Sequence, residues 1–398
     1  MDIFEKCWNF TRAKETIEQG IYPYFIPIQE NCGNRVVMNG REVIMIGSNN
    51  YLGLTKDPRV QEAAIQALKK YGTSCSGSRF LNGTLHLHEE LEHRLARFVK
   101  KQSALVFSTG YQTNLGAIST LIGRRDVVVT DKTNHASIFD GIFLAAGLNM
   151  DIKVKRYRHN DMADLERVLK QLDVDAPKMI ITDGVFSMEG SIVRLPELVN
   201  LGRRYNARVY VDDAHGIGVL GKTGRGTLEH YNMFDQVDLV MCTFSKSFAS
   251  LGGFIAGDEE VIHYIKHHSR PLIFSAAIPP ANIAAVLKSL EIIENEPQIV
   301  NRLHEIGDFM RREFQNLGFN TGESETPIIP IIIGDDIKTF QFWKALFEEG
   351  VYTNAVISPA VPPDRALLRT SYMASHTNED LEQVLEAFAK IGKKMGVI

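Results

Sequence analysis

Between about residue 50 and residue 270, short hydrophobic runs alternate with segments of helical periodicity, and this alternation constrains the fold more than any other feature. It is typical of βαβ units, in which strands of a parallel sheet are joined by helices. The runs that we read as buried strands are 104–107, 126–130, 179–183, 207–211, 238–242 and 251–257. The sequence therefore predicts an α/β protein.

A lysine stands at the end of one of these strands. Lys246 lies in the string Thr243-Phe244-Ser245-Lys246-Ser247, which is rich in small residues and hydroxyl groups. An amine in this place can condense with an aldehyde, as the Schiff-base lysine of a pyridoxal phosphate (PLP) enzyme does, while hydroxyls nearby hold the phosphate. The alternative is an ordinary surface lysine at a strand end.

Two acids follow the neighbouring strand 207–211, in the string Asp212-Asp213-Ala214-His215. Ligands of open parallel sheets bind at the carboxyl ends of strands, and PLP needs a carboxylate at its ring nitrogen. Spacing alone does not choose between Asp212 and Asp213. A metal site would need a further ligand at short spacing, which is missing, so we predict no metal.

Polar turns follow three other predicted strands. The turn 108–114 has small residues and leads into a helix, as a phosphate-binding turn does. The turn 131–137 contains His135, which either lies flat on an aromatic cofactor or is an ordinary loop histidine. The turn 184–190 contains Ser187.

The composition excludes several classes of protein. The formal net charge of −4 and the absence of a basic run argue against a nucleic-acid partner. Four cysteines without a C-x-x-C pair fit free thiols in a reducing cytoplasm. No signal design or membrane-length apolar run is present. The apolar residues of segment 3–10 would suit transient contact with a membrane surface, but packing on a dimer partner is the better explanation.

The pattern predicts three segments. Residues 1–50 form a helix and a hairpin arm that turns at Asn39-Gly40, 51–280 form a large PLP-binding domain, and 281–398 form a small C-terminal α/β domain. The string Gly216–Gly221 fits a dinucleotide fingerprint, but a loop follows it where that motif needs a helix.

Several strings together resemble the α-oxoamine synthases, fold-type I PLP enzymes that condense an amino acid with an acyl-CoA. The strings are Gly47-Ser48-Asn49-Asn50-Tyr51-Leu52-Gly53-Leu54, Gly77-Ser78-Arg79-Phe80-Leu81-Asn82-Gly83-Thr84, Asn134-His135-Ala136-Ser137, Asp212-Asp213-Ala214-His215 and Thr243-Phe244-Ser245-Lys246. The resemblance runs from about Tyr22 to Thr377. It implies a large domain with a mostly parallel seven-stranded sheet, a smaller C-terminal α/β domain, PLP as cofactor, and a homodimer with shared active sites.

The resemblance also implies roles for residues at the cofactor ring. Lys246 would bind the cofactor aldehyde and later move the substrate's α-proton. Asp212 would pair with the ring nitrogen, and His215, helped by Ser187, with the phenolic oxygen. His135 would stack on the ring and contact the substrate carboxylate.

The remaining roles concern the phosphate and the substrates. The phosphate ligands implied by the resemblance are Gly110, Tyr111, Thr243 and Ser245, with Ser275 and Ala276 reaching it from the partner subunit. Asn49, Ser78 and Arg369 match positions near the substrates, and the guanidinium of Arg369 suits a carboxylate.

Within the family, the runs 78–84 and 356–362 favour members that use L-serine and a long-chain acyl-CoA such as palmitoyl-CoA. The products would be a 3-keto long-chain base, CoA and carbon dioxide. Glycine or L-alanine as the amino acid, and another PLP class such as an aminotransferase or a lyase, remain alternatives. A non-catalytic subunit is a further alternative, but such a subunit should lack Lys246.

Overall fold

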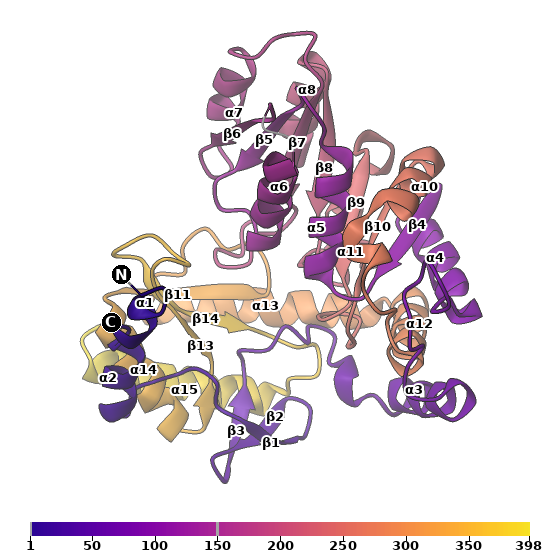
Figure 1. The fold of residues 1–398 in the computed structure, drawn as a ribbon. Helices are drawn as coiled ribbons and strands as arrows, with labels where there is room; N and C mark the ends of the chain where they lie inside the picture. Colours follow the sequence, from indigo (N-terminus) through magenta and orange to yellow (C-terminus); the bar gives the residue numbers. More distant parts are fainter. Residues whose placement is uncertain (1, 149–150) are drawn as a thin grey trace. The chain divides into compact units, whose positions relative to one another are not determined.

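The computed structural model describes residues 2–148 and 151–398 and divides into two compact units. The large unit is Asn49–Glu305, and the small unit combines the chain up to Ser48 with Ile306–Ile398. Figure 1 shows the elements of both units, coloured along the sequence.

The large unit contains a sheet of seven strands in the order β4-β10-β9-β8-β7-β5-β6 (Figure 1). The strands are β4 (Ser103–Phe107), β5 (Val127–Asp131), β6 (Lys153–Tyr157), β7 (Lys178–Asp183), β8 (Ala207–Asp212), β9 (Leu239–Thr243) and β10 (Gly253–Gly257). β10 is antiparallel to both of its neighbours, whereas β6, β5, β7, β8 and β9 pair in parallel. The predicted fold class, fold type I with a mostly parallel sheet, is confirmed.

Helices pack on this sheet through apolar faces. Ile118 of α5 and Ile142 of α6 are fully buried in one cluster with Val128 and Tyr210 of the sheet. The helices of the unit are η1 (Leu54–Lys56), α3 (Pro58–Tyr71), α4 (His86–Phe98), α5 (Gly110–Leu121), α6 (Ala136–Leu148), α7 (Met162–Leu169), α8 (Leu195–Arg204), α9 (Thr227–His230), η2 (Phe234–Gln236), α10 (Glu259–His268), α11 (Arg270–Ile273) and α12 (Pro280–Asn295). α13 (Gln298–Leu317) leads into the small unit.

The small unit has two sheets, ordered β1-β2-β3-β12 and β11-β14-β13. Its strands are β1 (Ile28–Asn31), β2 (Arg35–Met38), β3 (Arg41–Met45), β11 (Ile328–Gly334), β12 (Val351–Tyr352), β13 (Asn354–Val356) and β14 (Ala366–Ser371), and its helices are α1 (Glu5–Trp8), α2 (Arg12–Glu18), α14 (Asp336–Glu348) and α15 (Asn378–Lys394). Phe314, Phe319 and Phe388 form the centre of its core through edge-to-face ring contacts. Within residues 2–148 and 151–398, no helix is both long and apolar enough to cross a membrane.

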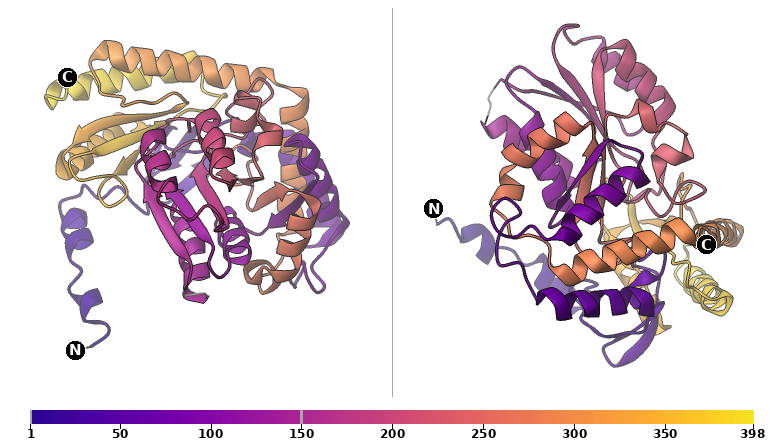
Figure 2. Two further views of the ribbon diagram at one scale, coloured as in Figure 1. Left: turned by 90° about the horizontal axis from the view of Figure 1, so that it is seen from above. Right: turned by 90° about the vertical axis from the view of Figure 1, so that its right-hand side faces the viewer.

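The unit boundaries differ from the predicted segments 1–50, 51–280 and 281–398. α12 belongs to the large unit because it packs against α3 and α4, and Figure 2 shows α12 and α3 side by side. The N-terminal hairpin is no separate arm, because β3 pairs in parallel with β12 of the small unit. The boundary of the small unit therefore lies within α13, at residue 306.

Candidate active site

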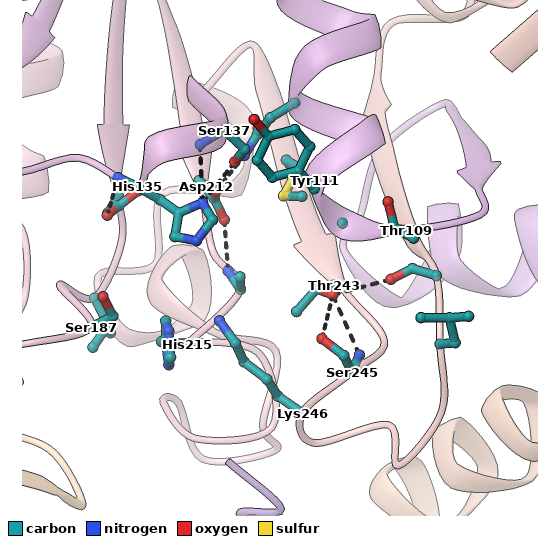
Figure 3. Close-up of a pocket in the computed structure, with 18 residues that line it drawn as sticks. Thr109, Tyr111, His135, Ser137, Ser187, Asp212, His215, Thr243, Ser245 and Lys246 are labelled. Carbon is teal, nitrogen blue, oxygen red and sulfur yellow. Dashed lines mark hydrogen bonds between the residues drawn. The ribbon is translucent and has the colours of Figure 1, made fainter. Parts of the chain in front are cut away.

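The candidate site is a cavity of about 270 Å³ at the carboxyl ends of β7, β8 and β9. The residues predicted from the sequence that line it are Gly110, Tyr111, His135, Ser187, Asp212, His215, Thr243, Ser245 and Lys246. In Figure 3, Lys246 extends from the loop after β9 toward Asp212 and His215. One cavity thus collects side chains from five separate turns.

One end of the cavity is suited to an anion. α5 begins at Gly110, and Thr109 caps it by accepting the Gln112 N–H at 3.0 Å. A Cβ on Gly110 would lie 2.6 Å from Thr243 Oγ1, so glycine is needed for the helix to approach the end of β9 this closely. Thr243 also contacts the hydroxyl of Ser245 at 2.9 Å. Hydroxyls and first-turn amides therefore converge, as in helix N-termini that bind phosphate.

The side chains of Asp212, which ends β8, and of Asp213, which follows it, diverge because consecutive side chains of an extended chain point to opposite faces. Asp212 lines the cavity, where its Oδ2 accepts from Asn114 Nδ2 at 2.6 Å and its Oδ1 from the Ala214 N–H at 3.1 Å. Asp213 instead accepts from the N–H and the hydroxyl of Thr227, at 2.8 and 2.5 Å. Burial raises the pKa of Asp213 to about 7. Asp212 is thus the acid of this pair that faces the cavity.

A chain of hydrogen bonds connects His135 to Asp212. Nδ1 of His135 lies 2.7 Å from Ser137 Oγ, which accepts from Asn114 Nδ2 at 2.9 Å, and Asn114 in turn donates to Asp212. Desolvation lowers the pKa of His135, and the carboxylate of Asp212 opposes this shift. The sequence did not predict Asn114 or Ser137 as site residues. Only their positions in the sequence pointed to the site. Ser137 ends the motif that contains His135, and Asn114 lies about one helical turn after Gly110.

Tyr51, which was not predicted as a site residue, connects the predicted residues His215 and Asn49. Its hydroxyl lies 2.7 Å from Nδ1 of His215 and donates to Asn49 Oδ1 at 3.2 Å. Tyr51 is fully buried, and its only signal in the sequence was its place in the string 47–54, two residues after Asn49.

The remaining predicted residues do not line this cavity. Ser275 accepts from Gln112 Nε2 of its own chain at 3.0 Å, and the carbonyl of Ala276 accepts from Ser108. Ser78 is buried in the large unit, and Arg369 is buried on β14 of the small unit. Their roles toward a partner subunit or a substrate stay predictions.

The donor set of the cavity fits PLP. Lys246 offers an amine for the aldehyde, Asp212 a carboxylate for the ring nitrogen, and the start of α5 with Thr243 and Ser245 a cradle for the phosphate. The wall contains His135 for the ring face and His215 with Ser187 for the phenolic oxygen.

Known proteins resemble this chain over nearly its whole length. Residues 41–388 match the family model for aminotransferases of class I and II. The serine palmitoyltransferase of Sphingobacterium spiritivorum is 48% identical over 390 residues, which cover 98% of this chain and 96% of the relative. The 8-amino-7-oxononanoate synthase of Thermoanaerobacter pseudethanolicus is 42% identical over 388 residues, 97% of each chain. A solved variant of the serine palmitoyltransferase from S. paucimobilis, with a bound PLP–myriocin aldimine, matches 100% of both chains with a TM-score of 0.96 and 34% identity.

Proposed function

Because the chain belongs to the aminotransferase class I and II family and is a PLP-dependent acyltransferase, we propose that it condenses L-serine with a long-chain acyl-CoA. The acyl donor is palmitoyl-CoA or a close analogue, and the reaction is the first step of sphingolipid synthesis. Serine loses its α-proton, its α-carbon forms a bond to the acyl carbon, and CoA leaves as the thiol. The carboxyl group then leaves as carbon dioxide, and the α-carbon takes up a proton in its place. The products are a 3-keto long-chain base, CoA and carbon dioxide.

The observation that carries this proposal is the 48% identity to a serine palmitoyltransferase over 98% of the chain. The cavity is consistent with it, because an amine, a carboxylate and an anion cradle lie around one space. When bound, PLP supplies the aldehyde and the ring that accepts electrons from the α-carbon.

Each residue of the cavity then has a defined task. Nζ of Lys246 holds the aldehyde before serine enters and afterwards accepts the α-proton. Asp212 keeps a proton on the ring nitrogen, and Asn114 and the Ala214 amide keep its carboxylate in place. His135, at the wall of the cavity, would contact the face of the cofactor ring and orient the substrate carboxylate. Arg369 is the proposed clamp for that carboxylate.

A second candidate is another α-oxoamine synthase that uses L-alanine or glycine, such as 8-amino-7-oxononanoate synthase or 2-amino-3-ketobutyrate CoA ligase. The 42% identity to an 8-amino-7-oxononanoate synthase over 97% of the chain supports it. The same residues would carry either reaction. The difference is the serine hydroxyl, for which His135, Ser78 and the cofactor phosphate are candidate partners. A site built for that hydroxyl rejects alanine, since its polar groups would be left unpaired.

We further propose that the enzyme works in the cytoplasm as a homodimer, with transient contact to membranes where its acyl substrate and product reside. Exposed apolar side chains of the N-terminal segment support contact with a surface or a partner chain, since Trp8 at the end of α1 and Phe10 after it are 65% and 60% exposed.

The test is a panel of L-serine, L-alanine and glycine against acyl-CoAs of increasing chain length, with release of free thiol as the readout. We expect efficient release with serine and long-chain acyl-CoA only. Equal or better turnover with alanine or glycine would establish the second candidate and leave the cofactor site unchanged. Transfer of an amino group without release of CoA would contradict both.

A further inference from the structure

A second carboxyl group lines the cavity beside Asp212. Asp183 ends β7 and is the register partner of Asp212 at the end of β8. Register partners on neighbouring strands point to the same face of a sheet, and both side chains reach the cavity. No role for Asp183 follows from the sequence or from the mechanism above.

Asp183 is attached to the turn that carries His135. Its Oδ2 accepts the backbone N–H of His135 at 3.1 Å, and its own N–H donates to Oδ1 of Asn134 at 2.9 Å. The amide of Asn134 donates to Thr130 Oγ1 and to the Ile181 carbonyl, both at 2.8 Å. Asn134 thereby joins the ends of β5 and β7, and the carboxyl of Asp183 holds the next residue.

We propose that Asp183 is a positioning residue for His135: its carboxyl holds the 134–135 turn, and with it the imidazole, at the wall of the cavity. This inference rests on the role proposed above for His135, as the group that meets the cofactor ring and the substrate carboxylate.

The surroundings of Asp183 suit a neutral carboxyl group. Its Oδ1 is buried and has no hydrogen-bond partner within residues 2–148 and 151–398, whereas both oxygens of Asp212 accept hydrogen bonds. Burial raises the pKa of Asp183 well above its usual range, and the carboxylate of Asp212 adds to this shift. Asparagine has the same shape as aspartic acid without the charge, so it can replace Asp183 in holding the 134–135 turn. It cannot replace Asp212, because the ring nitrogen of the cofactor needs an anion there.

The test measures amino-acid binding at equilibrium, independent of turnover. Serine is titrated into the PLP-loaded enzyme, and its dissociation constant is read from the change in cofactor absorbance. The variants are Asp183→Ala, Asp183→Asn, His135→Ala and the double variant Asp183→Ala/His135→Ala. We expect Asp183→Ala to weaken serine binding roughly 10-fold, and Asp183→Asn to restore most of that loss. In the His135→Ala background, Asp183→Ala should cause almost no further loss, because there is no imidazole to position.

Two results would overturn the proposal. One is an equal loss from Asp183→Ala in both backgrounds, which would make Asp183 a structural residue that acts independently of His135. The other is a loss in Asp183→Asn as large as in Asp183→Ala; this comparison holds even if the alanine variant folds poorly. If CoA release identifies alanine or glycine as the substrate, the titration uses that amino acid in place of serine. The choice of substrate and the role of Asp183 are therefore tested by separate measurements.

Discussion

The phenolic oxygen of Tyr51 lies 2.7 Å from Nδ1 of His215, in the interior of the large unit. Because the same hydroxyl donates to Asn49, one group joins a predicted substrate residue to a predicted cofactor residue. The two rings meet edge to face, with centroids 6.1 Å apart. A residue that is far away in the sequence and does not line the cavity thus contacts the imidazole of His215.

Replacing Tyr51 with phenylalanine removes this hydroxyl and leaves the ring in place. We expect Tyr51→Phe to lower kcat/KM about 10-fold, since a buried partner of His215 is lost, while the protein stays folded. Steady-state kinetics of CoA release measure the effect. Tyr352→Phe is the matched control, because Tyr352 is a partly buried tyrosine of the small unit. Similar activity of the two variants would mean that His215 keeps its orientation without Tyr51.

The sequence predicted the central strands because they are buried on both faces and read as continuous apolar runs. β5 is buried at every position and was predicted within one residue at each end. β6 was missed because Lys153, Lys155 and Arg156 give this edge strand a polar, largely exposed sequence. Hydrophobic periodicity therefore identifies a strand only where its side chains are buried against other parts of the core.

The same limit applies to the site. Residues at strand ends could be predicted, since the carboxyl ends of parallel strands meet at one edge. Spacing could not separate Asp212 from Asp213, because the choice depends on which face of β8 each side chain takes. Asn114, Tyr51 and Asp183 form hydrogen bonds with site residues from distant segments, and the partners in such bonds cannot be identified from periodicity or spacing.

Lys246 should be essential for catalysis. Lys246→Ala removes the amine that holds the aldehyde and moves the α-proton, so we expect multiple turnover to be abolished and the visible absorption band of the PLP-loaded enzyme to change. Absorbance spectra and CoA release report the two effects. Lys222→Ala, at an exposed lysine of a loop in the same unit, is the control. Sustained turnover by Lys246→Ala would refute the assignment.

Asp212 should matter through its charge. Asp212→Asn keeps the size of the side chain but removes the anion, so the ring nitrogen loses its proton and the α-carbanion is poorly stabilised. We expect kcat to fall on the order of 100-fold or more, with the fold retained. Asp213→Asn should be milder, because Asp213 contacts Thr227 outside the cavity. If kinetics and PLP retention show the reverse order, the cofactor uses the other carboxyl.

Asp213 should instead affect stability, in a way that depends on pH. Burial raises its pKa from 3.8 to about 7, so the folded protein binds this proton more tightly than the unfolded chain does. The protonated Asp213 therefore contributes to the free energy of unfolding. This contribution is fully present below pH ~4 and is lost as the pH rises through about 7. Each unit of difference between the folded and unfolded pKa corresponds to about 1.4 kcal/mol.

Urea unfolding at pH 5 and pH 8 tests this sign. The free energy of unfolding of the wild type should fall more between these two values than that of Asp213→Asn, by roughly 2 kcal/mol. Asparagine also perturbs the hydrogen bonds to Thr227, but it does so at both pH values and cancels in the comparison. An identical fall in both proteins would assign the pH dependence to other groups.

The partner subunit should complete each active site through Ser275. In the single chain, Phe274 beside it is 78% exposed, as expected of a residue that a second copy covers. We expect a homodimer in sedimentation, and we expect Ser275→Asp to be inactive, because a carboxylate there repels the cofactor phosphate.

The decisive measurement is complementation between Ser275→Asp and Lys246→Ala chains, co-expressed with different tags. If Ser275 serves the partner's site, the heterodimer has one site in which both the lysine and the serine are intact, and the mixture recovers about a quarter of wild-type activity. If Ser275 serves its own chain, every site carries a lesion, and no activity returns.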